Sequence, residues 1–227
     1  MNVKSLFNPE NQARVGLMFG QVFNAGIGFL TISWLAKNMP QETFGTWVLF
    51  LTNWGLIEMI RAGFVYQALV KFVASSDDPQ DKKGYATAAW IFSFLLTFIL
   101  YLFFKILGIF YVKVSPTGSL IFFFAHIGTL IWWMLPVNMA TWLGHAHEKY
   151  AQFWLIGFSS STLFFLFLLF MHIPNLEILY TYFIYSKISV AIVSIGLAPP
   201  VFSRSRVFHY LKSLYNYSKF TVISTLA

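Results

Sequence analysis

Six long apolar segments dominate the chain, separated by short polar turns. Each has about 20 or more consecutive, predominantly apolar residues, which is the length a helix needs to cross the hydrocarbon core of a bilayer. The segments are Gly16–Leu35, Phe44–Val65, Ala86–Val112, Leu120–Leu143, Phe153–His172 and Leu176–Val201. The pattern predicts an all-α integral membrane protein with six transmembrane helices.

A seventh apolar run begins near Phe220 and reaches Ala227 after only a few residues. It is too short to cross a membrane. We therefore expect residues 1–203 to form a six-helix transmembrane unit. Residues 204–227 are expected to hold a polar linker and the truncated start of a seventh helix.

The composition agrees with a membrane protein and excludes several kinds of chemistry. Hydrophobic residues make up 58% of the chain and charged residues only 10%, whereas soluble domains carry about 25% charged residues. The sequence contains no cysteine. Disulfides, thiolate metal sites and a cysteine nucleophile are therefore excluded.

The chain has a net charge of +7, and its basic residues fall mostly on one side of the predicted membrane segments. With the amino terminus placed in the cytoplasm, only Lys37 and Lys113 fall on the outer side. The cytoplasmic side receives Lys4, Arg14, Lys71, Lys82, Lys83, Lys149, Arg204, Arg206, Lys212 and Lys219. Such an excess is the positive-inside pattern that sets orientation. The basic charge therefore predicts topology and not a nucleic-acid partner. The polar stretch Ser75–Lys83 is predicted to be a solvated cytoplasmic loop.

The first apolar segment carries small and polar residues at intervals of four. Gly16, Gly20, Asn24 and Gly28 share one helical face, with Gln21 beside them. Small residues at this spacing let membrane helices approach closely. Either the stripe packs against another helix, or Gln21 and Asn24 line a polar cavity that binds substrate.

The second apolar segment contains two charges, Glu58 and Arg61, three residues apart and thus on one helical face. A charge at the bilayer centre costs about 2.5–3.5 kcal/mol on insertion scales. Two interpretations stay open: a self-compensating structural pair, or a pair facing a water-filled cavity. In the second case Arg61 would hold an anionic group and Glu58 would bind H⁺ or Na⁺ as the coupling ion.

Lys187 lies in the middle of the sixth segment, where its side chain cannot easily reach either interface. It is either a cavity-facing cation or a buried structural partner of Glu58. Tyr185 lies two residues before it in the sequence, and Trp132 lies deep in the fourth segment. Both are candidate substrate-binding residues. Trp132 fits a sugar-stacking role, although lipid-facing or core packing explains it equally well. Lys105, near the outer end of the third segment, is explained by snorkelling to the interface.

No motif for catalysis or a cofactor is found. The stretch from Gly144 to Lys149 (GHAHEK) has two histidines and one glutamate, an incomplete ligand set for a metal. We expect a solvated inner turn there. The chain is predicted to be neither an enzyme nor a metal- or cofactor-binding protein.

The first two segments resemble the opening of Wzx-like polysaccharide flippases. The resemblance lies in the glycine-bearing first helix, in L-A-K-x-x-P-x-x-x-F-G-x-W from Leu35 to Trp47, and in G-F-x-x-x-A-L-V-K-F from Gly63 to Phe72. It covers residues 14–75. The family belongs to the multidrug/oligosaccharidyl-lipid/polysaccharide exporter superfamily. Some relatives place arginines in the first helix; here none follows Arg14.

The resemblance implies a transporter of twelve to fourteen helices built from two lobes, with residues 1–203 as the amino-terminal lobe. Residues 204–227 would be the inter-lobe cytoplasmic linker, and the carboxy-terminal lobe of the same chain would be missing. The implied activity is flipping a polyprenyl-pyrophosphate-linked oligosaccharide across the bacterial inner membrane. Arg61 and Lys187 would be the cations available to its headgroup. The alternatives are a cation-coupled multidrug or metabolite exporter of the same superfamily and a membrane-embedded polyprenyl-lipid transferase.

Overall fold

A computed structural model describes residues 9–114, 118–147, 150–171, 175–197, 199 and 206–226. Within these ranges the regular structure is entirely α-helical. The helices are α1 (Pro9–Asn38), α2 (Gln41–Ser75), α3 (Pro79–Val114), α4 (Gly118–Ala146), α5 (Tyr150–Phe170), α6 (Leu176–Leu197) and α7 (Val207–Leu226).

Four of the helical stretches are long and apolar enough to cross a membrane: Gln41–Ser75, Pro79–Tyr111, Ile121–Ala146 and Leu176–Leu197. The part of α5 from Phe158 to Phe170 is a shorter apolar helix. The protein is therefore an all-helical, multi-pass membrane protein. The count of six spans stays a prediction.

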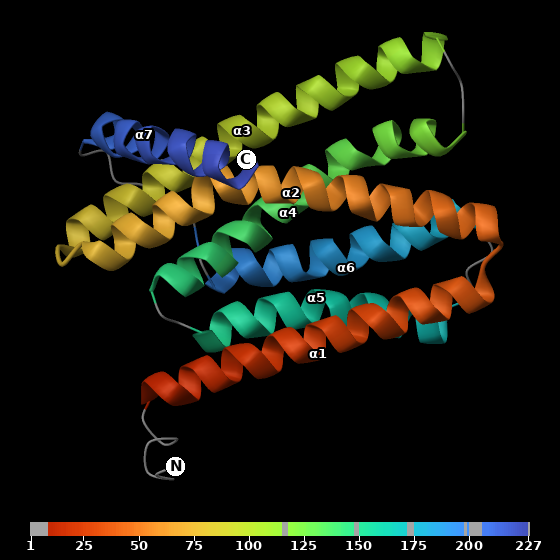
Figure 1. Cartoon of the computed structure of the whole chain (residues 1–227), viewed down its shortest axis with the longest axis horizontal. Coiled ribbons are helices and arrows are strands. Elements are labelled where there is room, and N and C mark those ends of the chain that lie inside the picture. The colour runs from red at the N-terminus through yellow and green to blue at the C-terminus, as the bar shows by residue number, and fades with distance from the viewer. Residues whose placement is uncertain are drawn as a thin grey trace.

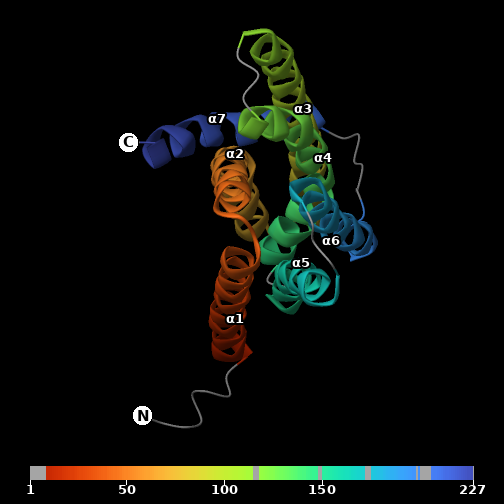
Figure 2. The ribbon, with the colours of Figure 1, turned by 90° about the vertical axis from the view of Figure 1, so that its right-hand side faces the viewer.

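Helices α1 to α6 run along the long axis of the molecule, and α7 runs obliquely beside α2 and α3 (Figures 1 and 2). The chain forms two layers in the end-on view, with α1 and α2 in one layer and α3 to α6 in the other. Helix α1 packs against α5 and scarcely touches α2, which packs against α3, α4 and α7. The first two helices thus diverge after a short turn.

The turn between α2 and α3 is shorter than predicted. Most of the expected loop Ser75–Lys83 belongs to α3, which begins at Pro79. The Asp78 carboxylate accepts a hydrogen bond from the Gln80 backbone N–H at 2.8 Å, as an N-cap residue does. Proline is favoured at the first helical position. The Asp-Pro pair therefore starts a helix here instead of marking an extended loop.

Two apolar clusters occupy opposite ends of the bundle. One, which we call the aromatic cluster, is rich in large rings: its buried residues include Trp47, Phe50, Phe122, Phe123, Phe164, Tyr180 and Phe183. The other, which we call the small-residue cluster, includes Ala68, Ala86, Ala88, Ala89 and Ala146, together with Tyr210 and Leu214 of α7. Helices α2 and α4 contribute to both clusters.

Glycines allow close helix approach in α3 and α4. A Cβ at Gly128 would lie 2.9 Å from the ring of Tyr101, and one at Gly84 would collide with the ring of Tyr210. By contrast, a Cβ at Gly28 of α1 would meet nothing within 4 Å. Close packing therefore does not require a glycine at this position of the predicted α1 stripe.

Candidate functional site

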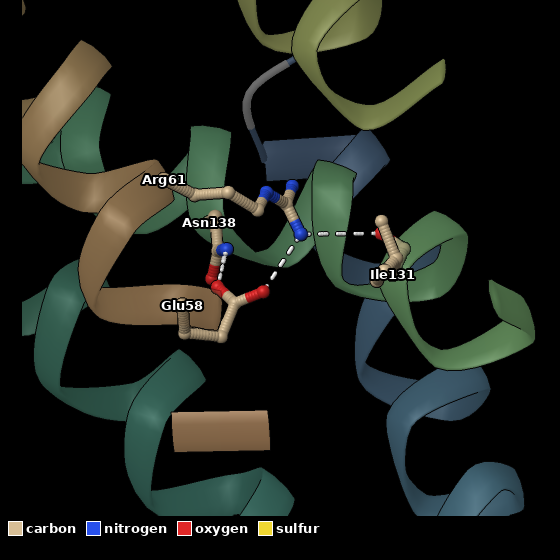
Figure 3. Close-up of polar contacts among 4 residues, drawn as sticks. All are labelled: Glu58, Arg61, Ile131 and Asn138. Atoms are coloured by element: carbon tan, nitrogen blue, oxygen red, sulfur yellow. Dashed lines mark hydrogen bonds and ion pairs between the residues drawn. The ribbon is translucent and has the colours of Figure 1, made fainter. Parts of the chain in front are cut away.

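The central polar group of the protein is an ion pair on α2, at the boundary between the two apolar clusters. Arg61 Nη1 donates to Glu58 Oε1 at 2.7 Å (Figure 3). The Arg61 side chain is 1% exposed and that of Glu58 is 19% exposed. The spacing of three residues predicted this shared face.

Helix α4 completes the environment of this pair. Asn138 donates from Nδ2 to Glu58 Oε2, so each carboxylate oxygen has its own donor (Figure 3). Arg61 Nη1 also donates to the backbone carbonyl of Ile131 at 3.3 Å. Because these donors come from two helices, the carboxylate of Glu58 links α2 to α4. We call Glu58, Arg61 and Asn138 the charged layer.

Pro136 lies inside α4, close to the turn that Arg61 contacts. It has no N–H, so the carbonyl four residues earlier, that of Trp132, loses its helical donor. Arg61 donates to the neighbouring carbonyl, that of Ile131, whose helical donor, the Leu135 N–H, the proline does not remove. Arg61 therefore adds a second donor at this carbonyl.

Arg61 keeps unused hydrogen-bonding capacity. Its second terminal nitrogen, Nη2, is buried and has no hydrogen-bond partner among the described residues. A guanidinium presents its donors as a rigid fork that matches carboxylate or phosphate oxygens. The pair with Glu58 uses only one prong of that fork.

Lys187 of α6 brings a second cation to the interior. Its Nζ donates to Ser160 Oγ of α5 at 2.5 Å and lies 4.8 Å from the ring centre of Phe183. No described carboxylate oxygen lies within the 4.0 Å of an ion pair with it, although its charge is within electrostatic reach of Glu58. The charged layer and the Lys187–Ser160 contact together draw on four helices: α2, α4, α5 and α6.

The remaining predicted binding residues lie apart from the charged layer. Gln21 and Asn24 of α1 are exposed. Trp132 packs edge-on against Phe94 and Tyr101 of α3. Tyr185 is 54% exposed. The structure brings together Glu58 and Arg61 with Lys187 nearby, and it does not gather the other four around them.

The sequence marks Asn138 and Ser160 as polar residues inside apolar segments, but it does not pair them with Glu58 and Lys187. Each is a buried polar residue in an apolar segment, which was the available signal. Their partners lie 80 and 27 residues away in the chain, so nothing local identifies the contact.

Three further polar contacts lie toward the ends of α4. At one end His126 Nε2 lies 2.9 Å from Glu177 Oε2, and the Tyr180 hydroxyl donates to the His126 carbonyl at 3.0 Å. At the other end His145 Nδ1 is hydrogen-bonded to the hydroxyl of Tyr66. Of the GHAHEK turn, residues 148 and 149 lie outside the described residues.

Comparison with known proteins identifies no relative: no protein-family model, no curated protein and no solved structure matches this chain.

Proposed function

We propose that this chain is the amino-terminal lobe of a flippase that moves a lipid-linked oligosaccharide across the bacterial inner membrane by alternating access. The observation that carries the proposal is the buried Glu58–Arg61 pair, bonded across to α4. Ionisable residues inside membrane segments are costly and are retained mainly where they serve transport or binding. We propose a lipid-linked oligosaccharide as the substrate because the motifs at Leu35–Trp47 and Gly63–Phe72 resemble those of Wzx-like flippases.

In the proposed cycle, the arrangement described here is a closed state. In it the Glu58 carboxylate holds the Arg61 guanidinium in an ion pair. Uptake of H⁺ or Na⁺ by Glu58 removes the negative charge that holds the guanidinium at 2.7 Å. Arg61, with its unpartnered Nη2, would then offer both prongs to a diphosphate. Ion uptake and headgroup binding would thus be coupled through one side chain.

Lys187 is proposed as the second cation for the headgroup. Breaking its single bond to Ser160 frees three N–H donors on a flexible stem. The exposed Gln21 and Asn24 on α1 would face the carboxy-terminal lobe and contact the glycan. The lobes would rock about this site while the lipid tail stays in the bilayer.

The test is polymer export in cells that carry the complete gene. Arg61→Ala and Lys187→Ala are expected to abolish surface polysaccharide while the protein still inserts in the membrane. Lys105→Ala is the matched control, since Lys105 packs near Tyr101 away from the charged layer, and it should export normally. Normal export by both Arg61→Ala and Lys187→Ala would refute the site. Loss of drug efflux without loss of polymer would favour the multidrug exporter.

A further inference from the structure

Asn138 is the neutral member of the charged layer, and its amide lies directly beside the Glu58 carboxylate. Its Nδ2 donates to Glu58 Oε2, while Arg61 Nη1 donates to the other carboxylate oxygen at 2.7 Å (Figure 3). Asn138 is 8% exposed. An asparagine amide carries an acceptor oxygen beside its donor nitrogen, so the same side chain can donate to Glu58 or accept from it.

The donors around the Glu58 carboxylate disfavour the binding of a metal cation. Hard cations such as Na⁺ are bound by several oxygen ligands. Both carboxylate oxygens of Glu58 instead receive N–H groups, whose hydrogens lie where a cation would bind. The positive charge of Lys187 also acts on Glu58. Na⁺ would have to displace two donors while two positive side chains lie nearby.

A proton, by contrast, can be added to Glu58 without the loss of a hydrogen bond. A protonated carboxyl group has one O–H donor. The last side-chain torsion of asparagine is broad and roughly two-fold, so the amide can turn over and present its oxygen to this O–H. Arg61 keeps the carbonyl of Ile131 as an acceptor at 3.3 Å. The same residues therefore satisfy both protonation states of Glu58.

The charged groups that act on Glu58 are Arg61 on its own helix and Lys187 on α6; α4 places the neutral Asn138 against it. Within the described parts of α1, α3 and α7, no charged side chain acts on Glu58. With Glu58 ionised, the three charged side chains carry one net positive charge, and once Glu58 is protonated they carry two. A diphosphate diester carries two negative charges, so protonation matches the site to the headgroup proposed above.

We infer that Asn138 determines the ion specificity of Glu58, making its carboxylate a proton site that excludes Na⁺. Asn138 is a positioning residue: it donates to the carboxylate and, after its amide turns over, accepts from the acid. The inference rests on the proposed function in taking Glu58 as the coupling group, and it narrows the coupling ion to H⁺. The protonation of Glu58 can be measured without transport.

Infrared difference spectroscopy of the full chain in lipid vesicles tests which ion binds. A protonated carboxyl group has a C=O stretching band that an ionised carboxylate lacks, and Glu58→Gln assigns the part of this band that belongs to Glu58. The pH titration is run in Na⁺ and again with Na⁺ replaced by choline. We expect the same midpoint in both salts.

Two results of this titration would overturn the inference. Competing Na⁺ would lower the midpoint by about one pH unit for each tenfold rise in Na⁺ concentration. A spectrum without any band that Glu58→Gln removes would show that Glu58 takes up no proton. Neither measurement needs a variant at position 138.

Asn138→Leu tests the amide itself. Leucine has nearly the same shape as asparagine but neither donates nor accepts, so the acid O–H loses its acceptor and the Glu58 band should move to higher frequency. Asn53→Leu is the matched control, because the Asn53 amide donates to the carbonyl of Leu49 in its own helix at 2.8 Å. Its Glu58 band should stay in place. An unmoved band in Asn138→Leu would overturn the role of Asn138 as acceptor.

Asn138→Asp tests the exclusion of Na⁺ by a second route. It replaces the N–H donor with a carboxylate, which supplies oxygen ligands for a cation. The midpoint should then fall with Na⁺, by up to about one pH unit per tenfold rise. A midpoint insensitive to Na⁺ in this variant would overturn the role of the Nδ2 donor.

The spectra separate this inference from the proposed function. A Na⁺-sensitive Glu58 in a protein that exports polymer would refute the inference alone. The expected spectra together with normal export by Arg61→Ala and Lys187→Ala would refute the proposed function alone.

Discussion

The two apolar clusters at either end of the bundle are built from different side chains, although α2 and α4 contribute to both. In the aromatic cluster, the ring of Phe50 packs edge-on against those of Phe122 and Tyr180, with ring centres 5.6 Å and 5.8 Å apart. In the small-residue cluster, five alanines lie between the helices beside larger side chains such as Leu69, Met139 and Trp142. Interlocked rings resist repacking, whereas small residues leave helix surfaces that slide with fewer collisions. We therefore expect the small-residue end to be the more mobile one.

The charged layer lies where one kind of packing gives way to the other. Arg61 follows Ile57 of the aromatic cluster by one helical turn and precedes Val65 of the small-residue cluster by another. A polar group at this boundary can change partners without displacing the rings. The predictions that follow test this division, from the largest expected effect to the smallest.

Arg61→Ala should be the most destabilising of these changes. It leaves the Glu58 carboxylate buried without its cation, and breaking a buried pair from one side costs about 3–5 kcal/mol. Thermal unfolding in detergent should show the loss. The Glu58→Gln/Arg61→Met variant, which removes both charges, should recover most of the stability. An unchanged melting temperature for Arg61→Ala would contradict a strong pair.

Phe50→Ala tests the aromatic cluster. Phe50 is 1% exposed and contacts five other aromatic rings. Truncating a buried ring in a membrane protein loses little transfer free energy, because lipid is as apolar as the core. The cavity left behind still costs about 2 kcal/mol of stability. Leu49→Ala, at a neighbouring position that is 58% exposed, should cost much less. Equal costs would show that the rings do not interlock as described.

Gly84→Leu tests the docking of α7 on the small-residue cluster. The new side chain must push the Tyr210 ring aside and break the hydrogen bond that the Tyr210 hydroxyl donates to Asp81, at a cost of about 1–2 kcal/mol. A label on α7 should become more mobile in electron paramagnetic resonance. Gly45→Leu, where an added Cβ meets nothing within 4 Å, should leave the label unchanged. An immobile label in Gly84→Leu would refute the contact.

The pH dependence of α7 docking should be small and confined to alkaline solution. The hydrogen bond to Asp81 raises the pKa of Tyr210 above its usual value of 10.0. A raised pKa in the docked state means that the contact stabilises docking below about pH 10 and is lost as the pH rises through the higher value. The mobility of an α7 label should therefore be constant at neutral pH and increase only in alkali. In Tyr210→Phe this alkaline increase should disappear; its persistence would assign the effect to another group.

The sequence predicted the helical, membrane-embedded class because long apolar runs carry that information locally. It also predicted that Glu58 and Arg61 share a face, because three residues make most of one helical turn. It could not pair Glu58 with Asn138 or Lys187 with Ser160, since those contacts depend on which helices become neighbours. The position of α7 could not be predicted for the same reason, because its buried face, at Tyr210, Leu214 and Ser218, depends on α2 and α3 covering it.

The central claim is that the Glu58–Arg61 pair is part of a transport mechanism and not only a structural brace. Exchanging the two charges, in Glu58→Arg/Arg61→Glu, keeps an ion pair on the same face of α2 while moving the cation. Polymer export and membrane abundance are measured together in cells that express the exchanged variant. The account predicts near-normal abundance with export abolished, because the guanidinium no longer lies beside Ile131. Normal export by the exchanged pair would contradict it and leave the pair a purely structural role.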